Sequence, residues 1–434
     1  MIKPVFYPSD EGDARVSALL SRRFDLNEDV EGTVREILKD VRAHGDDALL
    51  KYTDRFDAPG FSDKDLSITP DDIAYAYSLV DRNFIAALEK AIRNIREFHR
   101  RQVPNSWIMT RRMGAVLGQM VQPMDAAGLY VPGGKGGNTP LVSSVLMNAI
   151  PAGIAGVKRI ILTSPPNTEK KLDAHLLVAA SECGVTEIYK AGSAWAIAAM
   201  AYGTGTIAPV DVIVGPGNIY VTIAKKLVSG LVGIDMVAGP SEVVIIADKG
   251  ADARYVAADL LSQAEHDPMA TAVLITTDKT LGQRVAAEIE RRLKRLERKE
   301  TAARSISDNG LILIVNGIDT AVLLANRIAP EHLEIMTRDP WELVPKIRHA
   351  GAIFLGGYTP EPVGDYIAGP NHVLPTMGTA RFSSALGVET FLKRSSLISY
   401  TKNAFLDDAE DIIRLAEKEG LTAHADSIKA RLES

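Results

Sequence analysis

The chain has 434 residues, of which 46% are hydrophobic and 24% charged, a profile typical of a globular protein with an ample core. The formal net charge of −6 gives no reason to expect nucleic acid or an anionic membrane as partner, and no apolar run approaches the roughly 20 residues that would span a bilayer. The single cysteine, Cys183, excludes an intramolecular disulfide and a cysteine-rich zinc site. The first residues do not resemble a secretory signal, so we expect a cytoplasmic protein.

Residues 1 to about 110 are predicted to be mostly helical and strongly charged. The stretches VREILKDVRAHGDDALLKYTDRFD (34–57) and FIAALEKAIRNIREFHRRQ (84–102) place apolar residues near 3.6 spacing. His44 and His99 fall within these charged stretches, and we expect both to be solvated surface histidines.

After Gly114 short β-branched runs alternate with Ala- and Leu-rich helical stretches. Examples are RIILTS (159–164), SEVVIIAD (241–248) and TAVLITTD (271–278). Continuous apolar strands with helices between them indicate parallel sheets covered on both faces. We therefore predict an α/β fold of two Rossmann-like doubly wound units, with incomplete similarity to the dinucleotide fold and small helical N- and C-terminal extensions.

An internal duplication is also indicated. IILTSPPNTEKKLDAHLLVAA resembles AVLITTDKTLGQRVAAEI, and EIYKAGSAWAIAAMAYGTGTIAP resembles LILIVNGIDTAVLLANRIAP. Two related halves would leave a cleft between them, where sites in such sheets usually lie. The tail from about Phe382 is polar and helical with a modest apolar stripe, so we expect it to pack on a second subunit.

Four segments carry residues suited to chemistry. In DLLSQAEHDP (259–268), Gln263 and His266 share a helix face and can both ligate a divalent metal, although the segment alone is also compatible with a surface histidine. In APEHLE (329–334), Glu331 and His332 offer a carboxylate and an imidazole for proton transfer. The other two segments are a loop with Asp365, Asn371 and His372, and the tail motif LTAH with His424 and the preceding Glu419.

Glycine-rich turns follow strands at YVPGGKGGNTP (130–140) and VGPGN (214–218). Such turns let backbone N–H groups approach phosphates. Neither turn matches G-x-G-x-x-G or the P-loop pattern, so from the residues alone we predict only a nucleotide-sized cleft.

Eight segments together resemble the histidinol dehydrogenase family, in order and across nearly the whole chain. They are VRAHGDDALLKYTDRFD, GLYVPGG, VGPGN, IDMVAGPSEV, DLLSQAEHDP, APEHLE, NHVLPT and LTAH. The resemblance implies an NAD-dependent oxidoreductase that converts L-histidinol to L-histidine through the aldehyde, a four-electron oxidation in the last steps of histidine biosynthesis.

The resemblance also implies one zinc ion per subunit and a homodimer whose sites are completed across subunits. The implied ligands are Gln263, His266, Asp365 and His424, the last supplied by the partner. These nitrogen and oxygen donors do not distinguish Zn²⁺ from Mn²⁺.

The family's proton transfer maps to Glu331 and His332. Oxidation of an alcohol to an acid removes two hydrides, and the intermediate aldehyde must gain an oxygen from water. Cys183 lies where a helix runs into a strand and is interpreted as structural, so Glu331 is expected to activate that water. Substrate contacts implied by the resemblance are Ser241, Gln263, His266, His332, Asp365, His372, Glu419 and His424.

Contacts to NAD map to Tyr130 and Asn218. A third contact in the family is a glutamine of a GGAQAI-like segment, and here the segment is GSAWAI with Trp195 at that position. An indole can stack on a nicotinamide or adenine ring but cannot supply the paired donor and acceptor of an amide. Trp195 is thus either a cofactor contact or the wall of a pocket.

We expect four regions: an extension over 1–25, an α/β domain over 26–113 with 239–381 carrying the metal and acid/base residues, an NAD-side domain over 114–238, and a tail over 382–434 that reaches the partner. Three alternatives remain at this point. One is a paralogue that oxidises another amino alcohol or a diol such as sulfopropanediol. The others are a metal-dependent hydrolase using Glu331 and a non-catalytic binding protein.

Overall fold

The computed structural model describes residues 2–21, 28–134 and 139–433, so residues 135–138 of the first glycine-rich turn lie outside the described residues. The chain divides into two compact units. The larger comprises Met1–Gln102 with Asp125–Phe391, and the smaller comprises Val103–Met124 with Leu392–Ser434. No helix in the described part of the chain is both long and apolar enough to cross a membrane.

The larger unit contains a six-stranded parallel sheet. Its strands, in spatial order, are β1 (Pro4–Tyr7), β11 (Gly310–Val315), β10 (Thr271–Thr276), β9 (Glu242–Ala247), β12 (His332–Met336) and β13 (Ala352–Leu355). Every residue of β9, β10 and β12 is buried, as a parallel sheet covered on both faces requires.

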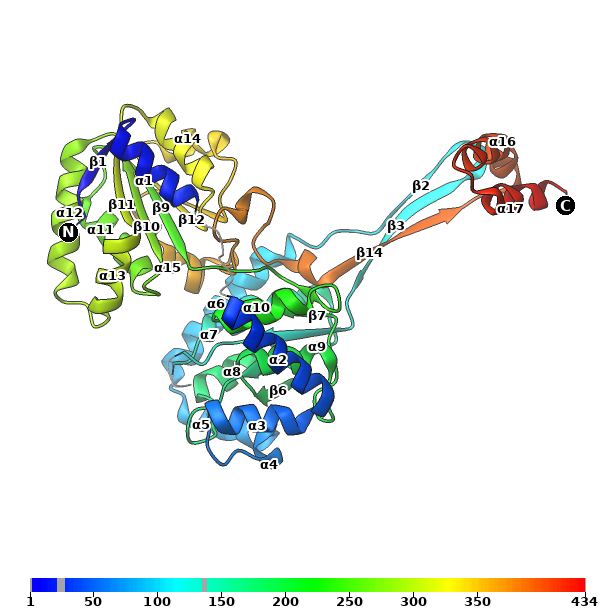
Figure 1. The fold of residues 1–434 in the computed structure, drawn as a ribbon, viewed down its shortest axis with the longest axis horizontal. Coiled ribbons are helices and arrows are strands. Elements are labelled where there is room, and N and C mark those ends of the chain that lie inside the picture. The colour runs from blue at the N-terminus through cyan, green and yellow to red at the C-terminus, as the bar shows by residue number, and fades with distance from the viewer. Residues whose placement is uncertain (1, 22–27, 135–138, 434) are drawn as a thin grey trace. The chain divides into compact units, whose positions relative to one another are not determined.

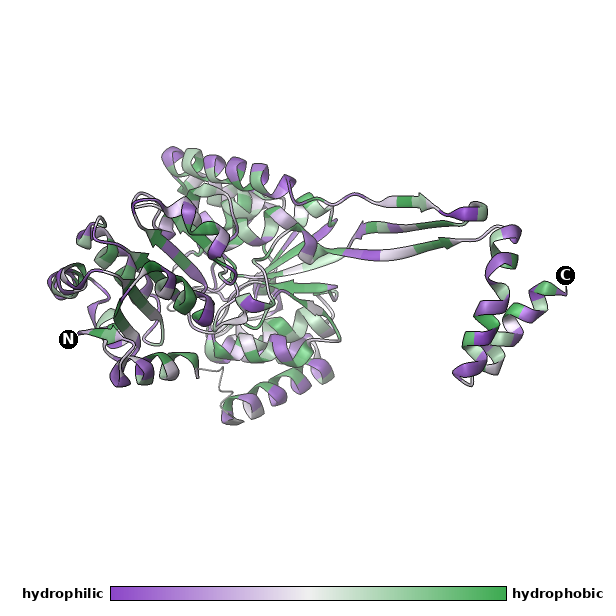
Figure 2. Cartoon of the chain, turned by 90° about the horizontal axis from the view of Figure 1, so that it is seen from above, coloured by the Kyte–Doolittle hydropathy of each residue, from purple (hydrophilic) through white to green (hydrophobic). Residues whose placement is uncertain are grey.

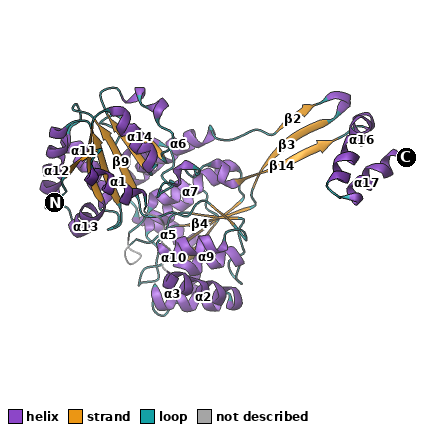
Figure 3. Ribbon diagram, turned by 45° about the horizontal axis from the view of Figure 1, so that its top comes forward, coloured by secondary structure: helices purple, strands orange, loops and turns teal. Residues whose placement is uncertain are grey.

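Helices cover both faces of this sheet (Figure 3). One face is packed by α11 (Ala253–Ala264), α12 (Lys279–Leu293) and α13 (Lys299–Asn309), and the other by α1 (Asp10–Leu20) and α14 (Ile318–Ile328). In Figure 2 the strands of this sheet are largely hydrophobic, whereas the helices alternate hydrophobic and hydrophilic residues along their length. The packing follows from that amphipathic pattern.

A second parallel sheet of five strands lies in the same unit. Its order is β6 (Glu187–Lys190), β5 (Arg159–Ser164), β4 (Ala126–Tyr130), β7 (Val212–Val214) and β8 (Gly233–Ile234). It is surrounded by α7 (Val142–Ala155), α8 (Ala174–Glu182), α9 (Ser193–Tyr202) and α10 (Ile219–Val228) (Figure 1). The expectation of a mixed α/β protein with parallel sheets is confirmed.

The N-terminal helices pack with the five-stranded sheet. They are α2 (Glu28–His44), α3 (Asp46–Phe56), α4 (Asp63–Leu66), α5 (Pro70–Leu79) and α6 (Arg82–Arg100). The apolar stripe of α2 shares a buried core with α9 and α10, α5 contacts α8, and α6 contacts α7. This grouping differs from the expected association of 26–113 with 239–381, because α2 and α3 present their apolar residues to the second sheet.

His99 is buried, so the prediction of a surface histidine at this position is wrong. The apolar stripe of α6 contains Leu88, Ile92 and Ile95, and His99 continues it at the same helical spacing. Its Nδ1 lies 2.8 Å from the Ile95 carbonyl oxygen. His44 is exposed as expected. Cys183 is buried at the end of α8, and burial raises the pKa of its thiol to about 12, which agrees with a structural role.

The smaller unit contains an antiparallel sheet in the order β14 (Leu392–Ser399), β3 (Val116–Pro123) and β2 (Trp107–Thr110). Two helices follow, α16 (Lys402–Lys418) and α17 (Thr422–Leu432). The tail thus contains two helices, α16 and α17, but β14 was not predicted, because LKRSSLIS carries little apolar alternation. Short helical turns occupy Arg112–Gly114, Pro340–Glu342, Val344–Lys346, Glu361–Val363, Gly364–Ala368, Thr379–Arg381 and Val388–Phe391.

Candidate active site

The predicted acid/base pair lies where two neighbouring strands begin. His332 is the first residue of β12, and Glu242 is the first residue of the adjacent β9. Because these strands are parallel and paired in register, their amino ends meet at one edge of the sheet. Ser241 and Glu331, one residue upstream on each chain segment, therefore meet there as well.

The backbone of Glu242 orients both predicted catalytic side chains. Its N–H donates to Glu331 Oε2 at 2.9 Å, and its carbonyl oxygen lies 3.1 Å from His332 Nδ1. This contact assigns the imidazole proton to Nδ1. His332 Nε2 is then a free base. It is buried, has no hydrogen-bond partner among the described residues and lies 4.0 Å from Glu361 Oε1.

Burial shifts the pKa values of His332 and Glu331 in opposite directions. It lowers the pKa of His332 to about 3, so the imidazole is neutral and can accept a proton. Burial raises the pKa of Glu331 well above its usual value, and the charges of Glu242 and Asp365 raise it further. Hydrogen bonds from the Glu242 amide and the Ser241 hydroxyl lower it. A carboxyl and an imidazole with pKa values displaced in this way are suited to acid/base work.

Two of the predicted metal ligands come from α11 and are close together. The side-chain amide of Gln263 lies 3.1 Å from His266 Nδ1. If the amide oxygen faces this nitrogen, the amide NH₂ faces Glu361 Oε2 at 3.1 Å and His332 Nδ1 at 3.2 Å. Because His332 Nδ1 donates to Glu242, we assign the amide hydrogen bond to Glu361. Gln263 thus connects the predicted metal ligand His266 with Glu361.

The structure adds Glu361, which the sequence did not single out. Glu361 and Asp365 are four residues apart on consecutive helical turns, a spacing that puts both carboxylates on one face and that could have identified the pair. Ligand atoms of His332, Glu361 and Asp365 all lie within 4.8 Å of one another. Burial raises the pKa of Asp365 to about 7 and that of Glu361 well above its usual value.

Two further buried carboxyl groups lie behind this cluster. Asp259 is one helical turn before Gln263 on α11, and Glu334 is two residues after His332 on β12. Their side chains are hydrogen-bonded to each other, and burial raises both pKa values. Glu334 Oε1 also accepts from the Glu361 N–H at 3.1 Å.

The donor set fits a divalent cation. Among the described residues no lysine or arginine forms an ion pair with Glu331, Glu361 or Asp365. Buried carboxylates without a compensating charge are costly unless they bind a cation. Carboxylate, amide and imidazole donors without a thiolate are compatible with zinc or manganese.

The loop after Asp365 is held against the neighbouring helices. Asn371 Nδ2 donates to the Met147 carbonyl of α7 at 2.6 Å, and it lies 3.5 Å from His99 Nε2. His372 follows directly. Its Nε2 is buried without a hydrogen-bond partner in the described ranges, and burial lowers its pKa to about 4. This nitrogen is thus available to a ligand.

The predicted cofactor residues Tyr130 and Asn218 belong to the other sheet. Tyr130 ends β4, and its hydroxyl accepts from the Ser193 N–H at 3.1 Å. Asn218 follows β7 and caps α10, with its Oδ1 accepting from the Tyr220 N–H at 3.1 Å. β4 and β7 are neighbours, so both residues lie at the carboxyl edge, the usual place for a nucleotide in such sheets.

Trp195 packs in the hydrophobic core beside the five-stranded sheet. It is only 5% exposed, and its ring stacks on Tyr52 and Phe56 with centroids 5.8 and 5.7 Å away. These contacts agree with a packing role for Trp195. A direct contact to the cofactor stays a prediction.

Glu419 and His424 belong to the smaller unit and are exposed there. Glu419 follows α16, and His424 lies in the first turn of α17. Their exposure leaves both side chains available to another molecule.

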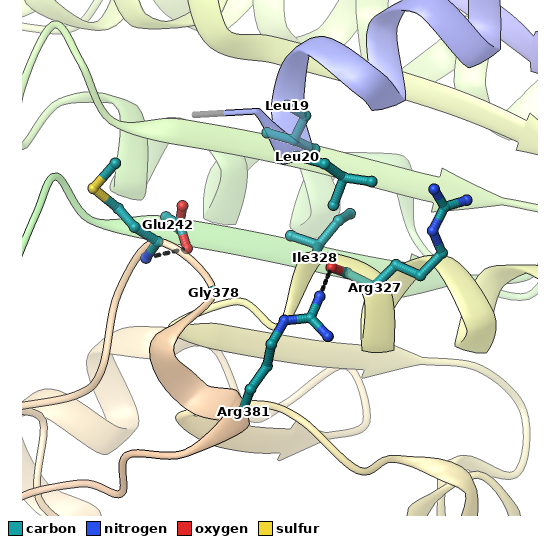
Figure 4. A pocket seen from close by; sticks show the side chains of 8 residues that line it. Leu19, Leu20, Glu242, Arg327, Ile328, Gly378 and Arg381 are labelled. Atoms are coloured by element: carbon teal, nitrogen blue, oxygen red, sulfur yellow. Dashed lines mark hydrogen bonds between the residues drawn. The ribbon is translucent and has the colours of Figure 1, made fainter. Parts of the chain in front are cut away.

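A cavity of about 390 Å³ lies against the side chain of Glu242 (Figure 4). Glu242 Oε2 accepts from the Met377 N–H at 3.1 Å, and Arg381 donates to the carbonyl oxygen of Arg327 across the cavity. Glu242 thus lines this cavity with its side chain and holds Glu331 and His332 with its backbone.

Comparison with known proteins identifies close relatives. The family model described as histidinol dehydrogenase matches residues 20–432. The chain is 58% identical over 433 residues to histidinol dehydrogenase of Desulfotalea psychrophila, covering 100% of both chains, and 55% identical over 413 residues to that of Nitratidesulfovibrio vulgaris, covering 95% of both. The crystal structure of histidinol dehydrogenase from Elizabethkingia anophelis superposes with a TM-score of 0.93 at 36% identity, covering 100% of this chain and 98% of that one.

Proposed function

The chain belongs to the histidinol dehydrogenase family and is an oxidoreductase, and we propose that it oxidises L-histidinol to L-histidine through the aldehyde with two NAD per turnover. The observation that carries this proposal is the buried His332 beside Glu331, with two carboxyl groups that could hold a metal, Glu361 and Asp365, within 4.8 Å of its imidazole. An alcohol oxidation needs a base next to the bound substrate, and this arrangement supplies one.

Gln263, His266 and Asp365 would hold zinc, together with His424 of the partner subunit. When bound, the zinc supplies positive charge that orients the substrate's imidazole and amine and favours the carboxylate form of Glu331, and NAD supplies the hydride acceptor for both oxidations. The carboxylate-rich surroundings suit a cationic amino alcohol and oppose an anionic diol.

His332 acts first as the general base. Its Nε2 accepts the alcohol proton as hydride leaves the carbinol carbon. The Glu242 carbonyl stabilises the imidazolium that results, through the Nδ1 hydrogen bond. Glu331, held by the Glu242 amide, then takes a proton from the water that attacks the aldehyde carbon. Once the imidazolium has released its first proton to solvent, His332 accepts the hydrate's hydroxyl proton in the second oxidation.

A homodimer completes the proposed site. In the smaller unit all four residues of β2 and almost all of β14 are exposed, including Trp107, Ile108 and Ile398 at 50%, 69% and 73%. Exposed apolar side chains of this kind favour burial by another protein surface. A second copy would cover it, and the exposed Glu419 and His424 would reach the partner's substrate and metal.

The test is the yield of NADH on complete conversion of limiting L-histidinol by zinc-loaded protein, with a chelated sample as control. Two NADH per histidinol, lost on chelation, is the expected result. Absence of NADH from folded, metal-loaded protein would overturn the substrate assignment, and a diol or another amino alcohol would then be tried.

A further inference from the structure

The two parallel sheets of the larger unit share one topology. In chain order, β4 to β8 are arranged as β6-β5-β4-β7-β8, and β9 to β13 are arranged as β11-β10-β9-β12-β13. The first strand of each set is central, the next two lie on one side and the last two on the other. The topology therefore supports the duplication that the sequence indicates.

The topology defines equivalent positions in the two sheets. The strand order reverses between β4 and β7 in one sheet and between β9 and β12 in the other. Open α/β sheets bind ligands outside the carboxyl ends of the strands at such a reversal. The cofactor residues Tyr130 and Asn218 occupy that place in the first sheet. The carboxyl ends of β9 and β12 are the counterpart in the second.

A cavity of about 390 Å³ lies at this counterpart position. It is lined by the segments that follow β9, β12 and β13, including Asp248, Lys249, Tyr255, Thr337, Arg338 and Tyr358. The proposed catalytic residues lie at the opposite, amino ends of β9 and β12. The cavity is therefore separate from the site already described, and its volume falls in the range of small-molecule pockets.

Two cationic and two acidic side chains line the cavity. Asp248 accepts from the N–H groups of Gly250 and Arg338, both at 2.8 Å, so its charge is met by two backbone donors. Asp252 is ion-paired with Arg254. Lys249 forms no ion pair among the described residues, and Arg338, whose side chain is 90% exposed, is paired at 3.9 Å with the exposed Asp339. Because an exposed ion pair contributes little, both cationic side chains can turn to an anionic ligand.

Aromatic and polar groups complete the lining. The rings of Tyr255 and Tyr358 lie 6.2 Å apart at 54°, and Tyr358 is 88% exposed, so its face is open to a planar ring. The hydroxyl oxygen of Thr337 is buried without a hydrogen-bond partner in the described part of the chain. A ligand with a planar ring, hydroxyl groups and an anionic group matches these features.

We propose that this cavity binds a mononucleotide, with its base against Tyr255 and Tyr358 and its phosphate on Lys249 and Arg338. The site goes beyond the proposed function, because the cofactor of the oxidation is expected at the carboxyl ends of β4 and β7. The two sites are related by the duplication but differ in their residues.

The experiment counts ADP sites on the full-length protein by titration calorimetry, with and without saturating NAD. We expect an ADP site that NAD does not displace, and we expect the variant Tyr358→Ala/Lys249→Ala to weaken this site at least about tenfold. The matched control is Tyr75→Ala/Lys64→Ala, which removes the same residue types from α5 and α4 and should leave binding unchanged. Unfolding temperatures of the variants establish that each is folded.

Two results would overturn the proposal. In one, NAD displaces all bound ADP. In the other, the Tyr358→Ala/Lys249→Ala variant binds ADP as the unchanged protein does. The variant Asn218→Ala tests the proposed cofactor site in the first sheet alone, through loss of NAD binding. Failure of that site can therefore be distinguished from failure of the proposed mononucleotide site.

Discussion

Lys225 and Asp235 form an ion pair that is closed to solvent, with side chains 3% and 1% exposed. Both residues hold the same turn, because Lys225 Nζ donates to the Gly215 carbonyl at 2.9 Å and Asp235 Oδ2 accepts from the Gly215 N–H at 2.8 Å. Gly215 has φ +116, and an added Cβ would lie 2.1 Å from the Tyr130 carbonyl oxygen. The ion pair thus fixes the VGPGN turn against the strand that ends in Tyr130.

Removal of this ion pair should impair cofactor binding more than turnover. Loss of one partner would leave a buried charge and cost roughly 3–5 kcal/mol of stability, so the informative variant is Lys225→Met/Asp235→Leu, which replaces both by apolar groups. We expect KM for NAD to rise about tenfold or more, with a smaller change in kcat, in steady-state assays. The exposed neighbour Lys226 provides the control variant Lys226→Met. An unchanged KM for NAD in the double variant would show that the turn does not depend on the pair.

Glu361 should position Gln263 for the metal. The carboxylate accepts the Gln263 amide N–H and so directs the amide oxygen towards His266. We expect Glu361→Ala to weaken zinc binding about 10–100-fold, as for other residues that orient metal ligands. Glu361→Gln keeps an oxygen acceptor and should lose less. Competition with a chromophoric chelator measures the affinity.

The two Glu361 variants separate positioning from direct ligation. Equal losses in Glu361→Ala and Glu361→Gln would indicate that the charge itself binds the cation. The exposed Glu342, changed to Ala, controls for loss of a carboxylate at the surface. Zinc affinities equal to that of the unchanged protein in both Glu361 variants would contradict any role of Glu361 at the metal.

If each active site takes residues from both subunits, two inactive variants should restore activity when they form a mixed dimer. His332→Asn and His424→Asn should each be nearly inactive. In a mixed dimer, the chain carrying His424→Asn retains its own His332 and receives an intact His424 from its partner, so one site is complete. An equal mixture refolded together should recover about a quarter of the original activity, since about half of the dimers are mixed. No recovery, despite formation of mixed dimers, would place each site within one chain.

Most of the fold could be predicted from the sequence because its signals are local. Uninterrupted apolar runs such as EVVIIA identify strands covered on both faces, and the similarity of two segment pairs indicates a duplication that the strand order supports. The sequence did not indicate β14, whose eight residues are mostly polar and whose pairing with β3 is a long-range contact. The packing of α2 and α3 with α9 and α10 was likewise not predicted, because an apolar stripe does not identify the surface it packs against.

The candidate site was predicted in part. The resemblance supplied Gln263, His266, Glu331, His332 and Asp365, which the structure brings together around the start of β9 and β12. Glu361, Glu334 and Asp259 were missed, although each lies two or four residues from a predicted member and shares its face. Acidic residues at such spacings are common on solvated helices, and only burial distinguishes these three. His99 was predicted to be exposed and is buried, again because the sequence pattern does not show which residues are buried.

Asp57 should make the stability of the protein depend on pH. Its Oδ2 is buried without a hydrogen-bond partner among the described residues, facing Gly192 at the amino end of α9, and burial raises the pKa of this carboxyl from 3.8 to about 7. A carboxyl with a raised folded-state pKa holds its proton more tightly in the folded protein. Its contribution is therefore most favourable below about pH 4 and is lost as the pH rises towards 7.

Asp57→Asn removes this ionisation and keeps the shape of the side chain. The variant should be more stable than the unchanged protein at pH 8, by on the order of a few kcal/mol at most, while the difference becomes small or reverses at pH 5. Urea unfolding at the two pH values measures it, with Asp47→Asn on the exposed face of α3 as the control. The stability gained by Asp57→Asn depends on pH only if the pKa of Asp57 is raised in the folded protein. An equal gain at pH 5 and pH 8 would therefore show that Asp57 is ionised at both pH values and that its burial does not govern its protonation.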